Sequence, residues 1–167
     1  MREFLVELLD GWGVADPVAV ALISALPVLE LRGGIPFGRL VLEMGSLPTW
    51  IWAVVGNLAP LPLVFWLLGV VDGYCTPYRL AWLRRLLDRL YAHTRRRHNS
   101  RFLRLRDLAL LVVVSIPLPL TGGWSGVLAA YVFGVPFRRA SWLIATGVVV
   151  AGTAVLALVD AGLVIWQ

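Results

Sequence analysis

The sequence predicts an all-α integral membrane protein, and three observations lead to that prediction. Of the 167 residues, 59% are hydrophobic and only 15% are charged, whereas soluble domains average roughly 45–50% apolar and about 25% charged residues. Two stretches are long and apolar enough to cross a bilayer, and two others are apolar but broken in the middle by proline and glycine. This composition argues against a water-soluble enzyme, a nucleic-acid-binding module and a disordered chain.

Two unbroken stretches have the length of a membrane-spanning helix, which needs about 20 apolar residues. Residues 48–71 contain no charged side chain, and residues 140–166 contain a single one, Asp160. We therefore predict one transmembrane helix in each stretch.

Two interrupted stretches, residues 17–46 and 108–137, predict re-entrant helical hairpins. Each is too long for one span and too short for two. A hairpin that enters, turns at mid-depth and leaves on the same side fits the length, because protein or water can cover its irregular tip. One kinked, tilted helix followed by a loop is the alternative. The interrupting residues are Pro27, Gly33, Gly34, Pro36 and Gly38 in the first stretch, and Pro117, Pro119, Gly122, Gly123 and Gly126 in the second.

The segments outside the core predict interfacial amphipathic helices and an orientation. Residues 1–14 are acidic and amphipathic, and residues 77–106 form a basic amphipathic linker. Ten of the fifteen arginines lie between Arg79 and Arg106, and loops rich in arginine stay on the cytoplasmic side. We therefore predict a multi-pass protein of the cell membrane, with both termini outside and the linker in the cytoplasm.

The chain also aligns with itself at an offset of 88 residues. Residues 17–74 would form one repeat and residues 108–166 the other, each a hairpin followed by a span, within a single membrane domain of residues 1–167. One crossing per repeat would invert the second copy, as in many transporters; chance matching in an apolar chain is the alternative. The matched pairs are Gly34 and Gly122, Gly38 and Gly126, Leu40 and Leu128, Pro48 and Pro136, Leu68 and Leu156, Val71 and Val159, and Asp72 and Asp160.

The hairpin tips carry the candidate site. Glu30 and Arg32 are ionisable residues at a depth where charge is costly and is therefore a sign of function. A second half-helix is expected to start beyond the glycines of each tip, and its free N–H groups would favour an anion such as a phosphate. Glu30 is the candidate proton-coupling residue. The candidate substrate-binding residues are Arg32, Gly33, Gly34, Asn57, Thr121, Gly122, Gly123, Trp124 and Ser125.

Simpler roles stand beside these. Arg39 and Glu43 are four residues apart and are expected to form an ion pair, or else a secondary site. Glu30 and Arg32 would in that simpler view neutralise each other. Asn57 would either line the site or bond to a neighbouring helix.

The sequence offers no cofactor or metal site. Cys75 is the single cysteine, and His93 and His98 lie in the basic linker without further ligands. Because no nucleophile–base pair lies at one depth, we expect no enzymatic activity. The basic charge lies in an amphipathic segment, so a lipid surface is the expected partner and nucleic acid is not.

Two motifs resemble a known family. Residues 30–38, Glu-Leu-Arg-Gly-Gly-Ile-Pro-Phe-Gly, and residues 116–126, Ile-Pro-Leu-Pro-Leu-Thr-Gly-Gly-Trp-Ser-Gly, resemble the small multidrug export proteins, which are remotely similar to the DedA/VTT membrane proteins. The resemblance implies paired re-entrant loops in an inverted repeat. It also implies proton-coupled transport of lipid phosphates such as undecaprenyl phosphate, or drug efflux as the family name says. DedA relatives carry arginine near the second loop, whereas residues 108–137 have no charge.

Three functions follow from the sequence as hypotheses. The first is a proton-coupled transporter or flippase for an anionic, phosphate-bearing lipid. The second is a proton-coupled efflux protein for small cationic drugs, with Glu30 shared by proton and drug. The third is a membrane scaffold that transports nothing. Because two spans are few to shield two hairpins from lipid, we also expect a homodimer.

Overall fold

The computed structural model describes residues 14–74, 100–116 and 122–165, and within those ranges the secondary structure consists of helices joined by short turns. The expected interfacial helix over residues 1–14, the linker up to residue 99 and the tip residue Thr121 lie outside the described residues, apart from residue 14. The elements are α2 (Asp16–Ala25), α3 (Glu30–Pro36), the π-helical turn η1 (Phe37–Val41), α4 (Ser46–Leu58), α5 (Leu61–Tyr74), α7 (Ser100–Ser115), α8 (Gly123–Val132) and α9 (Phe137–Ile165).

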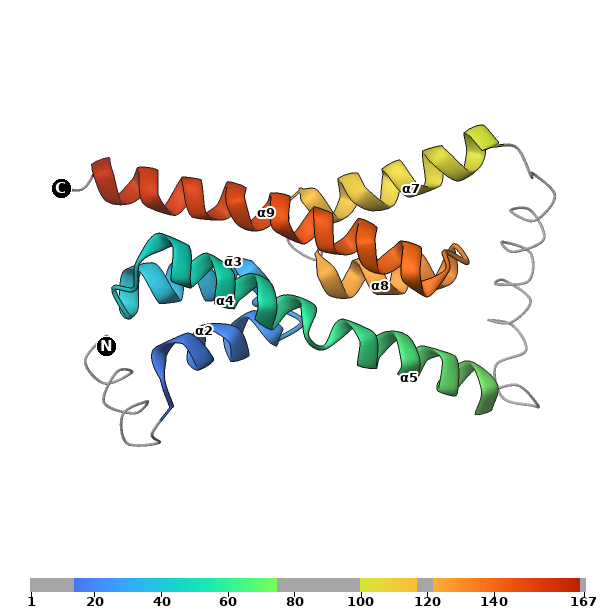
Figure 1. Cartoon of the computed structure of the whole chain (residues 1–167), viewed down its shortest axis with the longest axis horizontal. Coiled ribbons are helices and arrows are strands. Elements are labelled where there is room, and N and C mark those ends of the chain that lie inside the picture. The colour runs from blue at the N-terminus through green and yellow to red at the C-terminus, as the bar shows by residue number, and fades with distance from the viewer. Residues whose placement is uncertain (1–13, 75–99, 117–121, 166–167) are drawn as a thin grey trace.

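Two long apolar helices run the length of the molecule, as the sequence predicts for residues 48–71 and 140–166. Helix α9 is unbroken, and its segment Phe137–Gly162 is long and apolar enough to cross a membrane. The other candidate span, Ser46–Val70, consists of α4 and most of α5. It bends between Leu58 and Leu61 (Figure 1), because Pro60 and Pro62 lack the N–H groups that a straight helix would use there.

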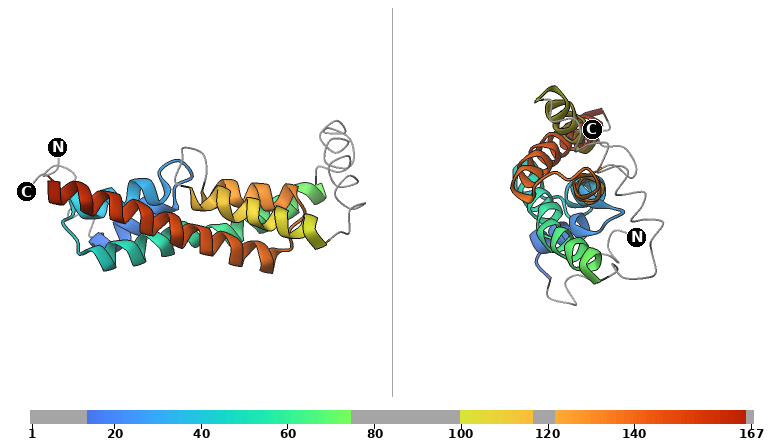
Figure 2. Two further views of the ribbon diagram at one scale, coloured as in Figure 1. Left: turned by 90° about the horizontal axis from the view of Figure 1, so that it is seen from above. Right: turned by 90° about the vertical axis from the view of Figure 1, so that its right-hand side faces the viewer.

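Two shorter helical pairs occupy opposite halves of the molecule. Helices α2 and α3 pack together beside α4, and helices α7 and α8 pack together beside the first half of α9. Figures 1 and 2 show the two pairs directed towards each other, with their tips near the middle of α9. Helix α7 begins at Ser100, so the second pair starts earlier than the boundary at residue 108 that the sequence predicts.

The break in the first pair differs from the sequence-based expectation. Helix α2 ends at Ala25 because Leu26 precedes Pro27 and is extended, with a ψ of 136°. The next helix then begins at Glu30, before the glycines and not beyond them. Gly34 lies inside α3. Only glycine fits at this position, because a Cβ there would overlap the Ser24 hydroxyl of α2. The glycines therefore permit close packing of the two helices and do not form the tip.

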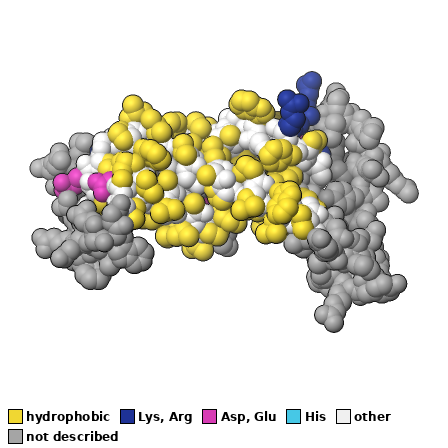
Figure 3. Space-filling view, turned by 60° about the horizontal axis from the view of Figure 1, so that its bottom comes forward, with side chains coloured by type: hydrophobic (Ala, Val, Ile, Leu, Met, Phe, Trp, Pro, Cys, Tyr) yellow, Lys and Arg dark blue, Asp and Glu magenta, His cyan; other side chains and the backbone are white. Residues whose placement is uncertain are grey.

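The surface exposes many large apolar side chains. A buried core that includes Val20, Ile35, Val114 and Ile144 joins both helical pairs to α9. Large apolar side chains are nevertheless exposed, including Trp142 at 77% and Leu158 at 71%. Figure 3 shows hydrophobic side chains between acidic groups at one end and basic groups at the other. Soluble monomers rarely expose such an area, so the surface is that of a protein surrounded by lipid.

Candidate functional site

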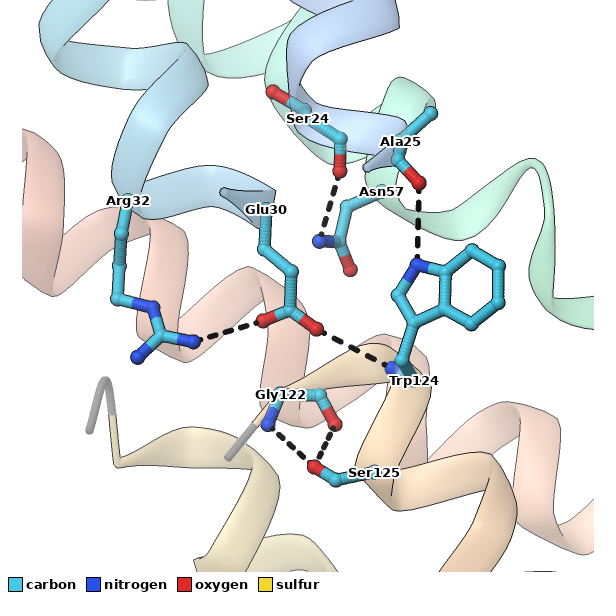
Figure 4. A network of polar contacts seen from close by, with 8 residues as sticks. All are labelled: Ser24, Ala25, Glu30, Arg32, Asn57, Gly122, Trp124 and Ser125. Carbon is cyan, nitrogen blue, oxygen red and sulfur yellow. Dashed lines mark hydrogen bonds and ion pairs between the residues drawn. The ribbon is translucent and has the colours of Figure 1, made fainter. Parts of the chain in front are cut away.

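The two helix tips meet around the carboxylate of Glu30. This residue begins α3 with a left-handed φ of 48° and is 5% exposed. A residue other than glycine adopts such a conformation at a cost of about 1–3 kcal/mol. The turn directs the carboxylate away from its own helix and towards the first residues of α8 (Figure 4). The strained backbone thus places a negative charge between the two halves of the chain.

Two positive groups hold this carboxylate. The backbone N–H of Trp124, at the start of α8, donates to Glu30 Oε1 at 3.4 Å, and Arg32 Nη2 lies 3.3 Å from Glu30 Oε2. The first N–H groups of a helix have no partner within it and carry partial positive charge. Glu30 therefore occupies an anion site that the arginine and the start of α8 form together.

Glycine is required where α8 begins. A Cβ on Gly122 would overlap the Glu30 carboxylate, and one on Gly123 would lie 2.6 Å from Asn57 Oδ1. The Ser125 hydroxyl accepts a hydrogen bond from the Gly122 N–H at 2.9 Å and lies 3.2 Å from the Gly122 carbonyl oxygen. Its bonds are thus made within the tip, whereas the sequence suggested a bond to substrate.

Side chains from other helices satisfy the last carbonyl groups of α2. Asn57 Nδ2 donates to the Ser24 carbonyl at 3.2 Å, and the indole N–H of Trp124 donates to the Ala25 carbonyl at 3.2 Å (Figure 4). Asn57 Oδ1 and the Ser24 hydroxyl are buried without a hydrogen-bond partner. Asn57 therefore fulfils both roles open to it in the sequence, since it binds a neighbouring helix and also lines the site.

A small cavity lies at this junction. Its volume is about 10 Å³, which is room for about one water molecule, and its polar lining comes from Glu30, Arg32, Asn57, Gly122 and Gly123. The structure therefore brings these five predicted residues together, with Trp124 and Ser125 beside them. Gly33 and Gly34 do not line the cavity, because they face Leu29 and Ser24 within the first pair.

The ion pair expected between Arg39 and Glu43 is replaced by a longer-range one. Arg39 Nε lies 2.7 Å from Asp160 Oδ1 in α9, and the Ser46 hydroxyl donates to Asp160 Oδ2 at 2.8 Å. The prediction of an ion pair from the four-residue spacing is wrong, because η1 ends at Val41 and Glu43 has a positive φ of 53°. Arg39 and Glu43 therefore do not share one helix face. The sequence marked Asp160 only as a repeated position.

A second ion cluster, absent from the sequence-based expectations, lies at the opposite end of α9 around a buried aspartate. Asp107 in α7 is 6% exposed and pairs with Arg106 at 3.3 Å and with Arg139 of α9. The Arg106 guanidinium also donates to the Phe133 carbonyl at 3.3 Å. Arg139 and Asp160 are about 31 Å apart along α9, close to the thickness of the bilayer's hydrocarbon core, about 30 Å. The sequence signal for this cluster was Asp107, an acidic residue that follows several arginines and directly precedes the apolar residues 108–114.

Metal binding has no support within the parts of the chain that the structure describes, since no three His, Cys, Asp or Glu side chains group together there.

The contact between Gly122 and Glu30 can be measured by a double-mutant cycle. We expect Gly122→Ala to destabilise the protein, because the new methyl group would overlap the Glu30 carboxylate. Backbone strain would not contribute, since the φ of 163° at Gly122 is extended and suits alanine. In a Glu30→Ala background the same change should cost less, with a coupling of about 0.5–3 kcal/mol. Unfolding by denaturant in detergent micelles measures both values.

Gly162→Ala is the control for this cycle, because a Cβ on Gly162 would meet nothing within 4 Å. Equal costs of Gly122→Ala in both backgrounds would show that the carboxylate does not contact Gly122.

Comparison with known proteins gives the family. No curated protein and no solved structure matches the chain significantly. A family model described as small multi-drug export protein matches residues 30–154. The matched range begins at Glu30, directly after the first tip, and includes the start of α8 and most of both long helices. The chain therefore belongs to the family of small multi-drug export proteins, whose name describes membrane transport.

Proposed function

We propose that this protein is a proton-coupled transporter of an anionic, phosphate-bearing lipid, of the undecaprenyl-phosphate or phospholipid class. The substrate's phosphate would take the place of the Glu30 carboxylate at Arg32 and at the start of α8. The observation that carries the proposal is the anion site itself, in which the protein's own carboxylate lies 3.4 Å from the Trp124 N–H and 3.3 Å from Arg32.

The coupling follows from competition between two anions. A carboxylate and a phosphate cannot share one small site that is shielded from water without strong electrostatic repulsion. When Glu30 takes up a proton, it loses its charge, and the arginine and the free N–H groups of α8 become available to the phosphate. Proton binding would thus precede substrate binding, and proton release would expel the substrate.

The arrangement in the membrane is part of the proposal. Helices α2 and α8 have ten residues each, a length of about 15 Å, which is half of the ~30 Å hydrocarbon core. With their tips meeting beside the middle of α9, the two pairs would be re-entrant hairpins that enter from opposite faces. The two halves of the chain would then be inverted repeats, with residues 75–99 in the cytoplasm.

A homodimer would cover the first tip. The segment Leu26–Leu29 is irregular, and Val28 within it is 81% exposed. Irregular backbone at mid-depth does not face lipid, so a second copy would pack against this segment.

A cationic drug is the second candidate substrate. The family description favours a drug as substrate, and Glu30 would be the counter-ion of a cationic one. Arg32 argues against it, because the guanidinium stays beside the carboxylate on the same helix and would repel a second cation.

Transport in liposomes tests the function. We expect wild-type protein to move fluorescently labelled phosphatidic acid between leaflets faster under an imposed pH gradient. Arg32→Ala should reduce the rate by about tenfold or more, because it removes a charge-assisted partner of the phosphate. Glu30→Gln should keep downhill movement and lose the response to the gradient, because glutamine is uncharged at every pH.

Exposed charges at the two ends supply matched controls, Arg138→Ala and Asp16→Asn, which should behave as wild type. Transport of ethidium that Glu30→Gln abolishes and Arg32→Ala spares would instead establish the drug exporter. Wild-type protein that transports neither probe would be a scaffold.

Cysteine labelling tests the orientation. In a Cys75→Ser background, Asp16→Cys and Glu43→Cys should react with an impermeant maleimide added outside cells. Arg104→Cys and Arg138→Cys should react only in inverted vesicles. All four positions are exposed, and the starts of α2 and α4 lie at the opposite end of the molecule from the starts of α7 and α9 (Figure 1). Labelling of all four from one side would exclude the proposed crossing.

Cross-linking tests the homodimer. In the same background, Val28→Cys should form a dimer with a short bifunctional maleimide in membranes, because the tip would face its copy. Leu158→Cys, which is 71% exposed on α9, serves as the comparison. Equal or weaker cross-linking at Val28 than at Leu158 would contradict a dimer that covers the tip.

A further inference from the structure

An apolar groove lies beside the polar cavity, where α5 leaves α9. Its volume is about 220 Å³, and its walls come from α5, α8, α9 and the last residue of α4, Leu58. The groove exists because the bend at Pro60 directs α5 towards α8, whereas α4 packs on α9. Among the described residues that line it, only Ser141 is polar, and the Ser141 hydroxyl donates to the Phe137 carbonyl at 2.9 Å. The groove is therefore a site for hydrocarbon.

The groove and the cavity are neighbours on every helix that they share. Helix α8 gives Gly123 to the cavity and Val127 to the groove, and α9 gives Val148 to the cavity and Ile144 to the groove. In each helix these residues are four apart, which is about one turn or ~6 Å. The apolar site thus begins one helical turn from the anion site.

Leu61 separates the two spaces. It is 7% exposed and lines the groove, and a Cβ on Gly123 would lie 3.3 Å from both of its methyl groups. Leu61 therefore packs against Gly123, a residue that lines the cavity.

Aromatic rings border the outer part of the groove. The Phe65 ring packs edge to face on Phe137, with centroids 5.3 Å apart, and on Tyr131, with centroids 6.1 Å apart. The volume is below the roughly 300–1,000 Å³ of pockets for drug-sized molecules, so a single hydrocarbon chain suits it better than a polycyclic drug. Phe137 is 46% exposed, so the groove opens sideways towards lipid.

We propose that this groove binds the hydrocarbon tail of the transported amphiphile while its phosphate occupies the anion site at Glu30 and Arg32. The inference rests on the proposed function and adds a second subsite to it. The chain would enter laterally between α5 and α9, and its head group would pass Leu61 to reach the site.

Photolabelling of the full-length protein in nanodiscs tests the tail site. The probe is dodecyl phosphate with a diazirine on its terminal carbon, and mass spectrometry locates the insertion. We expect insertion at Phe65 and Ile144 that unlabelled dodecyl phosphate displaces. Ala145→Phe, which fills the groove, should reduce this labelling by about tenfold. Ala145→Leu should have a smaller effect in the same direction, which keeps the test valid if phenylalanine prevents folding.

Ala157→Phe is the matched control, because Ala157 is exposed on the same helix and does not line the groove. It should label as wild type. Insertion spread equally over the lipid-facing Leu63 and Leu158, or labelling that neither substitution at Ala145 reduces, would overturn the tail site.

The head-group variants separate this inference from the proposed function. If Arg32→Ala abolishes transport of dodecyl phosphate while Ala145→Phe leaves its rate unchanged, the anion site stands and the tail site is wrong. If the groove is labelled as expected but Arg32→Ala changes neither labelling nor transport, the tail site stands and the phosphate function is wrong.

Discussion

Broken helices inside this protein leave backbone groups that need hydrogen-bond partners, and the rest of the structure depends on supplying them. Helix α2 ends with free carbonyl groups, and helix α8 begins with free N–H groups, both far from bulk water if the chain lies in a bilayer. An unpaired group there costs several kcal/mol. Asn57 and Trp124 donate to the ends of α2, and Glu30 accepts from the start of α8. Each partner comes from a different part of the chain, so the two helical pairs stabilise each other only when their tips meet.

The same requirement explains why the tips form a site. The groups that close the junction are those that an anionic substrate would use, since a phosphate would bind the Trp124 N–H and the Arg32 guanidinium that Glu30 contacts. A junction held by a carboxylate can be opened by a proton, whereas one held by apolar packing alone cannot. The cavity of about 10 Å³ is therefore consistent with a closed state, and a larger site would require the tips to separate. The ion clusters at Asp107 and Asp160 tie both ends of α9 to the neighbouring helices, so such a separation would begin between them.

Much of the helical arrangement was predictable from residues that act locally. The two long helices follow from uninterrupted apolar runs, and the break before Pro27 follows from the restriction that proline places on the preceding residue. The proximity of Glu30, Arg32, Asn57 and Gly122 around one cavity was also predictable, because all four lie at or near the breaks in the apolar stretches. The role of Gly34 was not predictable, because glycine occurs both in turns and where a neighbouring helix packs closely. Only the position of Ser24 across from it decides between the two.

By itself, the sequence determined that the chain is helical, apolar and interrupted twice, since hydrophobicity and proline act within a few residues. The tertiary structure decided which charges meet. Arg39 pairs with Asp160, 121 residues away, although Glu43 is four residues away, and Glu30 reaches the start of α8 because its own backbone is left-handed. Both pairings depend on how whole helices pack. Electrostatic attraction falls with distance in space and takes no account of distance along the chain, so a sequence pattern cannot rank partners that only folding brings together.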